Sequence, residues 1–263
     1  MNVPNIFRVV LTIAFAAFWI GGVVSYSMFG GPPAGSEWAA PLFLALAGAL
    51  IVVLTRWRNL PWLALVAGVG FTSELVGIAT GAPYGQYEYT STLGPKILGV
   101  PLVLAAAWLV VTSYVQSWMA ILKPPRFLRP LLAAAWMTVI DLLIDPLAAG
   151  PLGYWTWAGG GSYFGIPWTN FLGWFVVSLA IFLVIPQSWQ PRAAVRAVGA
   201  SVILFFGIIA FALDLFVPGG IAVGLLALDV VSAAKLQTNK PARGSSGRTT
   251  VGRSDFETTK GEA

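Results

Sequence analysis

The sequence contains no cysteine and no histidine, and only 10% of its 263 residues are charged. Without cysteine it provides neither a thiolate nucleophile nor a cysteine zinc site, and without histidine it lacks the common ligands of haem and di-iron centres. No metal site and no redox cofactor are therefore expected. The formal net charge is +5, but the basic residues lie in short loops and a C-terminal tail. That pattern orients membrane helices and does not indicate nucleic-acid binding.

Hydrophobic residues make up 57% of the chain, far outside the balance of a soluble domain. A helix that spans a bilayer needs about 20 mostly apolar residues. The sequence therefore predicts an all-α polytopic membrane helix bundle over residues 1–235, with about eight transmembrane helices. The first apolar run is too long for a signal peptide, so we expect it to be retained. The predicted spans are 6–28, 38–55, 61–80, 97–118, 128–149, 166–186, 193–216 and 219–235.

Loop charge predicts the orientation of the bundle in the cell membrane. Loops with arginine or lysine alternate with loops 29–37, 81–96, 150–165 and 217–218, which contain only Lys96. Basic loops face the cytoplasm, so both termini are expected there. Residues 236–263 are polar and rich in Gly, Ser and Thr, which predicts a disordered cytosolic tail. The basic positions that set this orientation are Arg56, Arg58, Lys123, Arg126, Arg129, Arg192 and Arg196.

Two segments of the chain share one pattern. "PYGQYEY" at 83–89 and "PLGYWTW" at 151–157 both read Pro, any, Gly, any, aromatic, any, aromatic. Downstream, "LGVP" and "FGIP" are each followed by a tryptophan seven residues after the proline, Trp108 and Trp174. Turns and interfacial anchors could produce such similarity by chance. The agreement of spacing with residue type instead favours a parallel helix-loop-helix repeat, with units at about 61–118 and 128–186.

Each predicted unit carries acidic residues in its first helix. An acid at the centre of a spanning helix costs about 2.5–3.5 kcal/mol, so Glu74, Asp141 and Asp145 should be either paired or used. Asp141 and Asp145 are four residues apart and share a helical face. Pro146 has no N–H, which leaves the Leu142 carbonyl without its helical partner. We therefore expect this face to line a polar cavity.

The predicted topology places these acids in the outer half of the membrane, where they could converge on one site. Asp214 is interpreted as a helix-end residue in contact with water, Glu88 is equally explained as an ordinary loop residue, and Asp229 is interpreted as structural. The aromatic residues of the two loops could form an ordinary interfacial belt, or could present ring faces to a cation or an extended apolar ligand. The candidate catalytic residues are Glu74, Asp141 and Asp145. The candidate substrate-binding residues are Tyr84, Tyr87, Glu88, Tyr89, Trp155, Trp157, Tyr163, Trp168 and Asn170, the last also explained as a local cap.

Three segments resemble a known family. "SELVGIATGAPYGQYEYTSTLGPKILGVPL", "DLLIDPLAAGPLGYWTW" and "YFGIPWTNFLGWFV" are similar to the integral-membrane carotenoid hydratases, the family of γ-carotene 1'-hydroxylase and bisanhydrobacterioruberin hydratase. The resemblance covers about residues 60–185. It implies cofactor-independent addition of water across the terminal C=C of an acyclic carotenoid, giving a tertiary alcohol. The implied partners are the carotenoid, water and the lipid bilayer, and association with other enzymes of the pathway stays open.

The implied chemistry assigns roles to the acids. An alkene is a poor base, so its protonation needs an acid that stays protonated until the substrate arrives, a form that burial favours. One of the three candidate acids would donate the proton, and a second would take up the proton that the captured water loses. We expect Glu74 and Asp141 to be this acid and base, in either order. Asp145 would set their protonation through like-charge coupling.

Two other functions remain open at this point. The spacing of Asp141 and Asp145 is shared by magnesium-diphosphate sites of membrane prenyltransferases, but a second acidic motif and nearby basic residues are missing from the sequence. A transporter or proton-coupled carrier of a small or lipophilic solute would also explain a helix repeat with intramembrane acids. Magnesium dependence would distinguish the first alternative, and solute flux without chemical change would distinguish the second.

Overall fold

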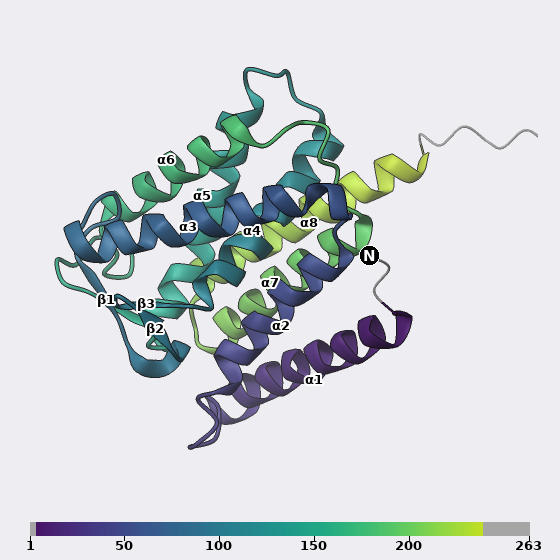
Figure 1. Cartoon of the computed structure of the whole chain (residues 1–263). Coiled ribbons are helices and arrows are strands. Elements are labelled where there is room, and N and C mark those ends of the chain that lie inside the picture. The colour runs from purple at the N-terminus through teal and green to yellow at the C-terminus, as the bar shows by residue number, and fades with distance from the viewer. Residues whose placement is uncertain (1–3, 239–263) are drawn as a thin grey trace, which may run out of the picture.

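The computed structural model describes residues 4–238 and shows a bundle of long helices (Figure 1). Two short two-stranded sheets lie together at one end of the bundle. The described residues form the α-helices α1 (Asn5–Phe29), α2 (Ala39–Leu54), α3 (Leu60–Thr80), α4 (Leu104–Leu122), α5 (Arg129–Ala149), α6 (Trp168–Val184), α7 (Ala193–Ala212) and α8 (Phe216–Thr238). The strands are β1 (Tyr87–Tyr89), β2 (Lys96–Ile97), β3 (Val100–Pro101) and β4 (Trp155–Trp157), and the 3-10 turns are η1 (Trp57–Asn59) and η2 (Ser91–Leu93).

The helices confirm the predicted fold class of an all-α polytopic membrane bundle. Within the described part of the chain, five are long and apolar enough to cross a membrane: α1, α3 together with η1, α4, α5 and α7. Apolar helices α2 and α6 and residues 216–232 of α8 are shorter. Backbone groups in lipid must be hydrogen-bonded within the protein, and helices satisfy this requirement locally. Most of the predicted tail, from residue 239 onward, lies outside the described residues.

Two predicted boundaries are wrong. The span predicted at 97–118 begins as a helix only at Leu104, because β2 and β3 form a hairpin first. Leu98 and Gly99 both adopt positive φ values, 48° and 89°, as tight two-residue hairpin turns require. The loop predicted at 217–218 is instead a turn at 213–215, where Asp214 has φ 59° and α8 follows at Phe216.

The repeated motifs have matching local structures. Phe164 and Gly165, the counterparts of Leu98 and Gly99, also have positive φ values, 50° and 78°. They lie between Tyr163 and Ile166, which form an antiparallel bridge. The two tryptophans at equivalent positions downstream, Trp108 and Trp174, stack with ring centroids 4.5 Å apart. The two units therefore contact each other through equivalent residues.

The sheet between the units shows how they are related. Strands β1 and β4 pair antiparallel, and Glu88 lies opposite Thr156, its own counterpart in the second motif. A two-fold relation brings equivalent residues face to face in this way. Helix α3 leads into β1 and α5 leads into β4, so both helices end at the same sheet and run in the same direction. This arrangement is that of the predicted parallel repeat.

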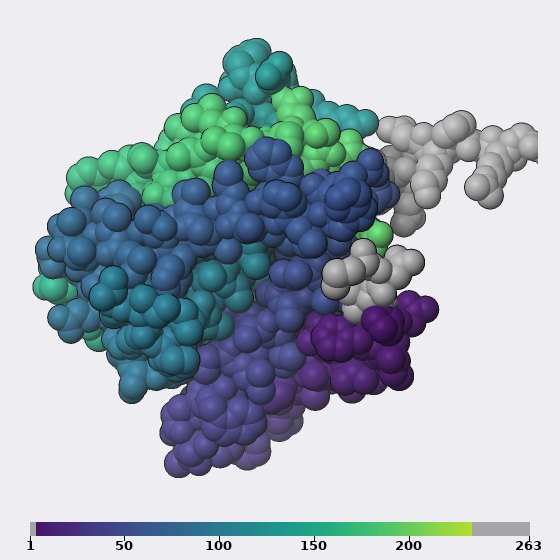
Figure 2. Space-filling model, in the orientation of Figure 1, coloured from purple at the N-terminus to yellow at the C-terminus, as the bar shows by residue number. Residues whose placement is uncertain are grey.

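Helix α1 lies at the edge of the bundle, against α2 and α7 (Figure 1). The space-filling view shows α1, α2 and their connection as a lobe beside the repeat units (Figure 2). The indole of Trp19 donates a hydrogen bond of 2.8 Å to the Ser201 carbonyl of α7. Phe15 stacks on Phe43 of α2 at 5.3 Å. Phe15 is the one buried residue of α1, so most of the surface of this helix faces outward.

Candidate active site

Glu74 lies on the inner face of α3 and is only 5% exposed. Its carboxyl group accepts three hydrogen bonds. The hydroxyls of Tyr87 and Tyr89 donate to Oε2 at 2.6 and 2.8 Å, and Nε1 of Trp108 donates to Oε1 at 3.2 Å. All three donors are neutral groups, and hydrogen bonds donated to a carboxyl group favour its ionised form. The three donors therefore offset part of the cost of burying a charge at Glu74.

Strand β1 delivers both tyrosines to Glu74 because residues two apart in a strand face the same side. Tyr87 and Tyr89 are buried, whereas Glu88 between them is exposed on the opposite side. Burial, reinforced by the charge of Glu74, raises the pKa of both tyrosine hydroxyls. They therefore remain protonated and able to donate. Gly77 leaves room for this contact, since a Cβ there would lie 2.7 Å from the Tyr87 hydroxyl.

In the second unit one amide, that of Asn170, donates hydrogen bonds to both acids. Asp141 and Asp145 lie one turn apart on α5 and are 2% and 1% exposed. The Nδ2 atom of Asn170, in the first turn of α6, donates to Oδ2 of each at 2.7 Å. This shared donor occupies the position between the two carboxyl groups. Oδ1 of Asp141 has no hydrogen-bond partner among the described side chains.

Strand β4 supplies donors to Asp145 as β1 does to Glu74. Oδ1 of Asp145 accepts from Nε1 of Trp155 at 2.7 Å and from Nε1 of Trp157 at 3.4 Å. With the bond from Asn170, Asp145 accepts from three neutral donors, the same number as Glu74. Asp141 accepts from only one of the described side chains, so the two acids of α5 have different environments.

The carbonyl freed by Pro146 has a specific partner. The hydroxyl of Tyr163 donates to the Leu142 carbonyl at 2.8 Å. Burial, with Asp141 and Asp145 nearby, raises the pKa of Tyr163 to about 12, which keeps the hydroxyl protonated. The sequence indicated that this carbonyl would be free, and the structure shows that a loop residue 21 positions further along caps it. This hydrogen bond connects the loop between α5 and α6 to the turn of α5 that carries Asp141 and Asp145.

Aromatic pairs join the two carboxyl groups of the site. Tyr87 packs against Trp157 with ring centroids 5.0 Å apart, and Tyr89 packs edge-on against Trp155 at 5.7 Å. In each of these two pairs the tyrosine donates a hydrogen bond to Glu74 and the tryptophan donates one to Asp145. The sequence predicted one shared site for three acids. The structure brings Asp141 and Asp145 together on Asn170 and places Glu74 in an adjoining set.

The remaining predicted substrate-binding residues lie in different places. Tyr84 is buried, with its hydroxyl 2.7 Å from that of Ser73, and the side chains of Glu88 and Trp168 are exposed, Trp168 by 71%. Two contributors were missed by the sequence prediction, Ser73 and Trp108. The repeat pattern singles out Trp108, because it matches Trp174 in position. Its hydrogen bond to Glu74 joins residues 34 positions apart, and sequence spacing does not predict such a contact.

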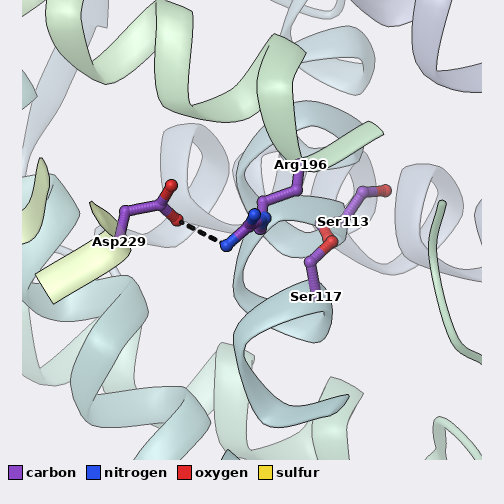
Figure 3. A network of polar contacts seen from close by, with 4 residues as sticks. All are labelled: Ser113, Ser117, Arg196 and Asp229. Atoms are coloured by element: carbon purple, nitrogen blue, oxygen red, sulfur yellow. Dashed lines mark hydrogen bonds and ion pairs between the residues drawn. The ribbon is translucent and has the colours of Figure 1, made fainter. Parts of the chain in front are cut away.

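A second polar cluster lies near the opposite ends of the helices. Arg196 of α7 and Asp229 of α8 form an ion pair of 3.6 Å, and Ser113 and Ser117 of α4 lie beside it (Figure 3). The pair joins α7 to α8, which agrees with the interpretation of Asp229 as structural. Neither residue contacts the acids of α3 and α5 by a hydrogen bond.

Comparison with known proteins identifies the family of the chain. The sequence profile described as "Carotenoid biosynthesis protein" matches residues 39–233, which include both repeat units and all the acids above. The chain belongs to the carotenoid biosynthesis protein family. The bisanhydrobacterioruberin hydratase of Haloarcula japonica is 27% identical to it over 195 residues, covering 70% of this chain and 66% of that protein. No solved structure matches the chain.

The family match leaves α1 outside its range, since it begins at Ala39. All the hydrogen bonds to the three acids fall within the matched residues. The site of this carotenoid biosynthesis protein is therefore built wholly from the region shared with the family.

Proposed function

We propose that the chain is a carotenoid hydratase, which adds water across the terminal C=C of an acyclic carotenoid end and forms a tertiary alcohol. The observation that supports this most directly is the pair of buried carboxyl sets, joined by aromatic rings, in a family member similar to a hydratase. Hydration of an isolated double bond needs a proton donor, a proton acceptor and a way to stabilise a carbocation. The site offers a group for each role.

Asp141 is the proton donor in this proposal. Asn170 binds Asp141 and Asp145 through a single Nδ2 atom, so two negative charges would lie close together in a buried place. Like charges at such a distance disfavour double ionisation, and the pair retains a proton. Asp145 has three donors and is better stabilised as the anion. The proton therefore resides on Asp141, whose Oδ1 is free to transfer it.

The transferred proton bonds to the less substituted alkene carbon and leaves a tertiary cation on the other. The rings of Tyr87 and Trp157 lie between the two carboxyl sets and can present π faces to this cation. Water then bonds to the cationic carbon and loses a proton to Glu74, the carboxylate of the adjoining set. The net change is the addition of one water molecule, with a proton passed from Asp141 to Glu74 and returned through solvent before the next turnover.

The position of Asn170 favours this reading over a magnesium-diphosphate site. Its amide nitrogen occupies the place between Asp141 and Asp145 that a bridging divalent cation would take, and it uses one oxygen of each. We also propose that residues 1–235 form one catalytic bundle in the cell membrane, with the arginine-bearing helix ends and both termini in the cytoplasm. The repeat units then open toward the outer half of the bilayer.

The experiment that tests this function uses cells that accumulate an acyclic carotene such as lycopene. The wild-type chain should produce a carotenoid heavier by one water. Because general acid–base groups contribute about 10²–10⁴-fold, Asp141→Asn and Glu74→Gln should each lower hydration at least 100-fold. Glu88→Gln is the matched control, since Glu88 lies in the same strand as Tyr87 and Tyr89 but faces outward. Full activity in both Asp141→Asn and Glu74→Gln would refute the assignment.

A further inference from the structure

A cavity of about 660 Å³ lies between the sheet end of the repeat units and the lobe of α1 and α2. Its walls come from α1, the 30–38 connection, the start of α2, the middle of α7, η2 and the loop at 151–154. This volume is within the range of about 300–1,000 Å³ that is typical of small-molecule sites. The aromatic residues that line it include Phe18, Tyr26, Phe43, Tyr154, Phe205 and Phe206.

Two consecutive residues, Tyr154 and Trp155, lie between the cavity and the acids of the candidate active site. Tyr154 lines the cavity, and its ring lies 6.3 Å from that of Trp155. Trp155 in turn donates its indole N–H to Asp145 at 2.7 Å. An apolar chain in the cavity would therefore extend from the wall next to the acids toward α1.

We infer that this cavity binds the linear apolar chain of an isoprenoid polyene, next to the end that reacts. The inference rests on the proposed function. It assigns a binding place to the part of the substrate that the acids do not contact. Two of the walls, α1 and α7, are long and apolar enough to cross a membrane, so an occupant can reach the cavity from the lipid phase. The aromatic lining residues Phe18, Phe43 and Phe206 suit a flat conjugated chain, which packs well against aromatic groups.

Helix α1 gives the cavity a wall that the family match does not include, because that match begins at Ala39. The wall is held by the bond from Trp19 to Ser201 and by the close approach of Gly22 to Phe205, where an added Cβ would lie 2.7 Å from the ring. Gly21, next to it, lines the cavity and has no other described atom within 4 Å of where its Cβ would be. A side chain at position 21 would project into the cavity without displacing the helix.

The test fills the cavity from α1 and measures polyene binding separately from turnover. The series Gly21→Ala, Gly21→Val and Gly21→Leu is placed in the Asp141→Asn background, reconstituted in nanodiscs. Lycopene binding is followed by quenching of tryptophan fluorescence. Gly224→Leu in the same background is the matched control, because Gly224 is an exposed helical glycine of α8 with open space around it and no part in the cavity.

Binding should weaken stepwise with side-chain size, by at least tenfold for Gly21→Leu, while Gly224→Leu binds as the parent does. In the active background, Gly21→Leu should raise KM for the carotene far more than it lowers kcat. Ser25→Leu, one turn along α1 and also lining the cavity, provides a second variant if Gly21→Leu fails to fold. Unchanged lycopene affinity in folded Gly21→Leu and Ser25→Leu would overturn the inference.

The failure of this inference is distinguishable from failure of the proposed function. If Asp141→Asn hydrates at the wild-type rate, the catalytic assignment is wrong, whatever the binding series shows. If Asp141→Asn is inactive but the binding series is flat, the acids act on a chain held elsewhere, and the cavity has another role.

Discussion

Removal of the amide that binds both acids of α5 gives the sharpest test of the site's energetics. In Asn170→Ala, Asp141 and Asp145 each lose a hydrogen bond of 2.7 Å, and both remain buried. A hydrogen bond to a charged group contributes about 1.5–3 kcal/mol. Because the pair is proposed to carry one charge, we count one such bond and one ordinary bond of about 1 kcal/mol. The expected loss of unfolding free energy is therefore about 2.5–4 kcal/mol.

The measurement is the unfolding free energy of the reconstituted protein, by denaturant titration, alongside hydration activity. Asn59→Ala serves as the control, because Asn59 makes no side-chain cap hydrogen bond at the start of α3. That change should alter stability by less than about 0.5 kcal/mol. Adding Asp145→Asn to Asn170→Ala removes one buried acid, and it should restore part of the stability without restoring activity. An Asn170→Ala protein as stable as the Asn59→Ala control would refute the reasoning.

Two further substitutions probe the positioning of the acids. Gly77→Ala places a Cβ 2.7 Å from the Tyr87 hydroxyl, so it should weaken the Tyr87–Glu74 bond and lower kcat at least tenfold. Gly68→Ala is the control, because Gly68 has open space around it, and it should leave kcat unchanged. Equal kinetics in the two variants would contradict this prediction. Tyr163→Phe leaves the Leu142 carbonyl unpaired and should cost about 1 kcal/mol in a denaturant titration. Since the folded-state pKa of Tyr163 is raised from 10.0 to about 12, the stability advantage of wild type over Tyr163→Phe should be complete below pH 10 and disappear as the pH rises through 12. An advantage independent of pH across that window would show that the hydroxyl does not titrate as assigned.

The loop between α3 and α4 shows where sequence patterns stop being sufficient. The apolar run from 97 predicts a helix, because hydrophobicity alone does not distinguish a short hairpin from the start of a span. The turn at Leu98 and Gly99 depends on two consecutive positive φ values, and only the glycine gives a local hint of them. The repeat contained a further hint, since Phe164 and Gly165 form the same turn ahead of α6.

The sequence predicts Glu88 as a substrate-binding residue, together with the tyrosines on either side of it. Strand periodicity sends alternate side chains to opposite faces, and the structure accordingly buries Tyr87 and Tyr89 and exposes Glu88. The sequence predicts a loop over residues 81–96, and only the strand that the structure shows at Tyr87–Tyr89 imposes this periodicity.

The sequence by itself determined that the chain is a bundle of membrane helices, because long apolar runs in lipid have to satisfy their backbone hydrogen bonds within each helix. It also predicted Glu74, Asp141 and Asp145 as the candidate catalytic residues, since an unpaired carboxyl group in such a helix is too costly to be incidental. Only the tertiary structure decided that Glu74 joins Tyr87, Tyr89 and Trp108, and that Asn170 binds both acids of α5. These bonds connect residues 13 to 34 positions apart. They depend on how two repeat units pack around a shared sheet, and local propensity carries no information about that packing.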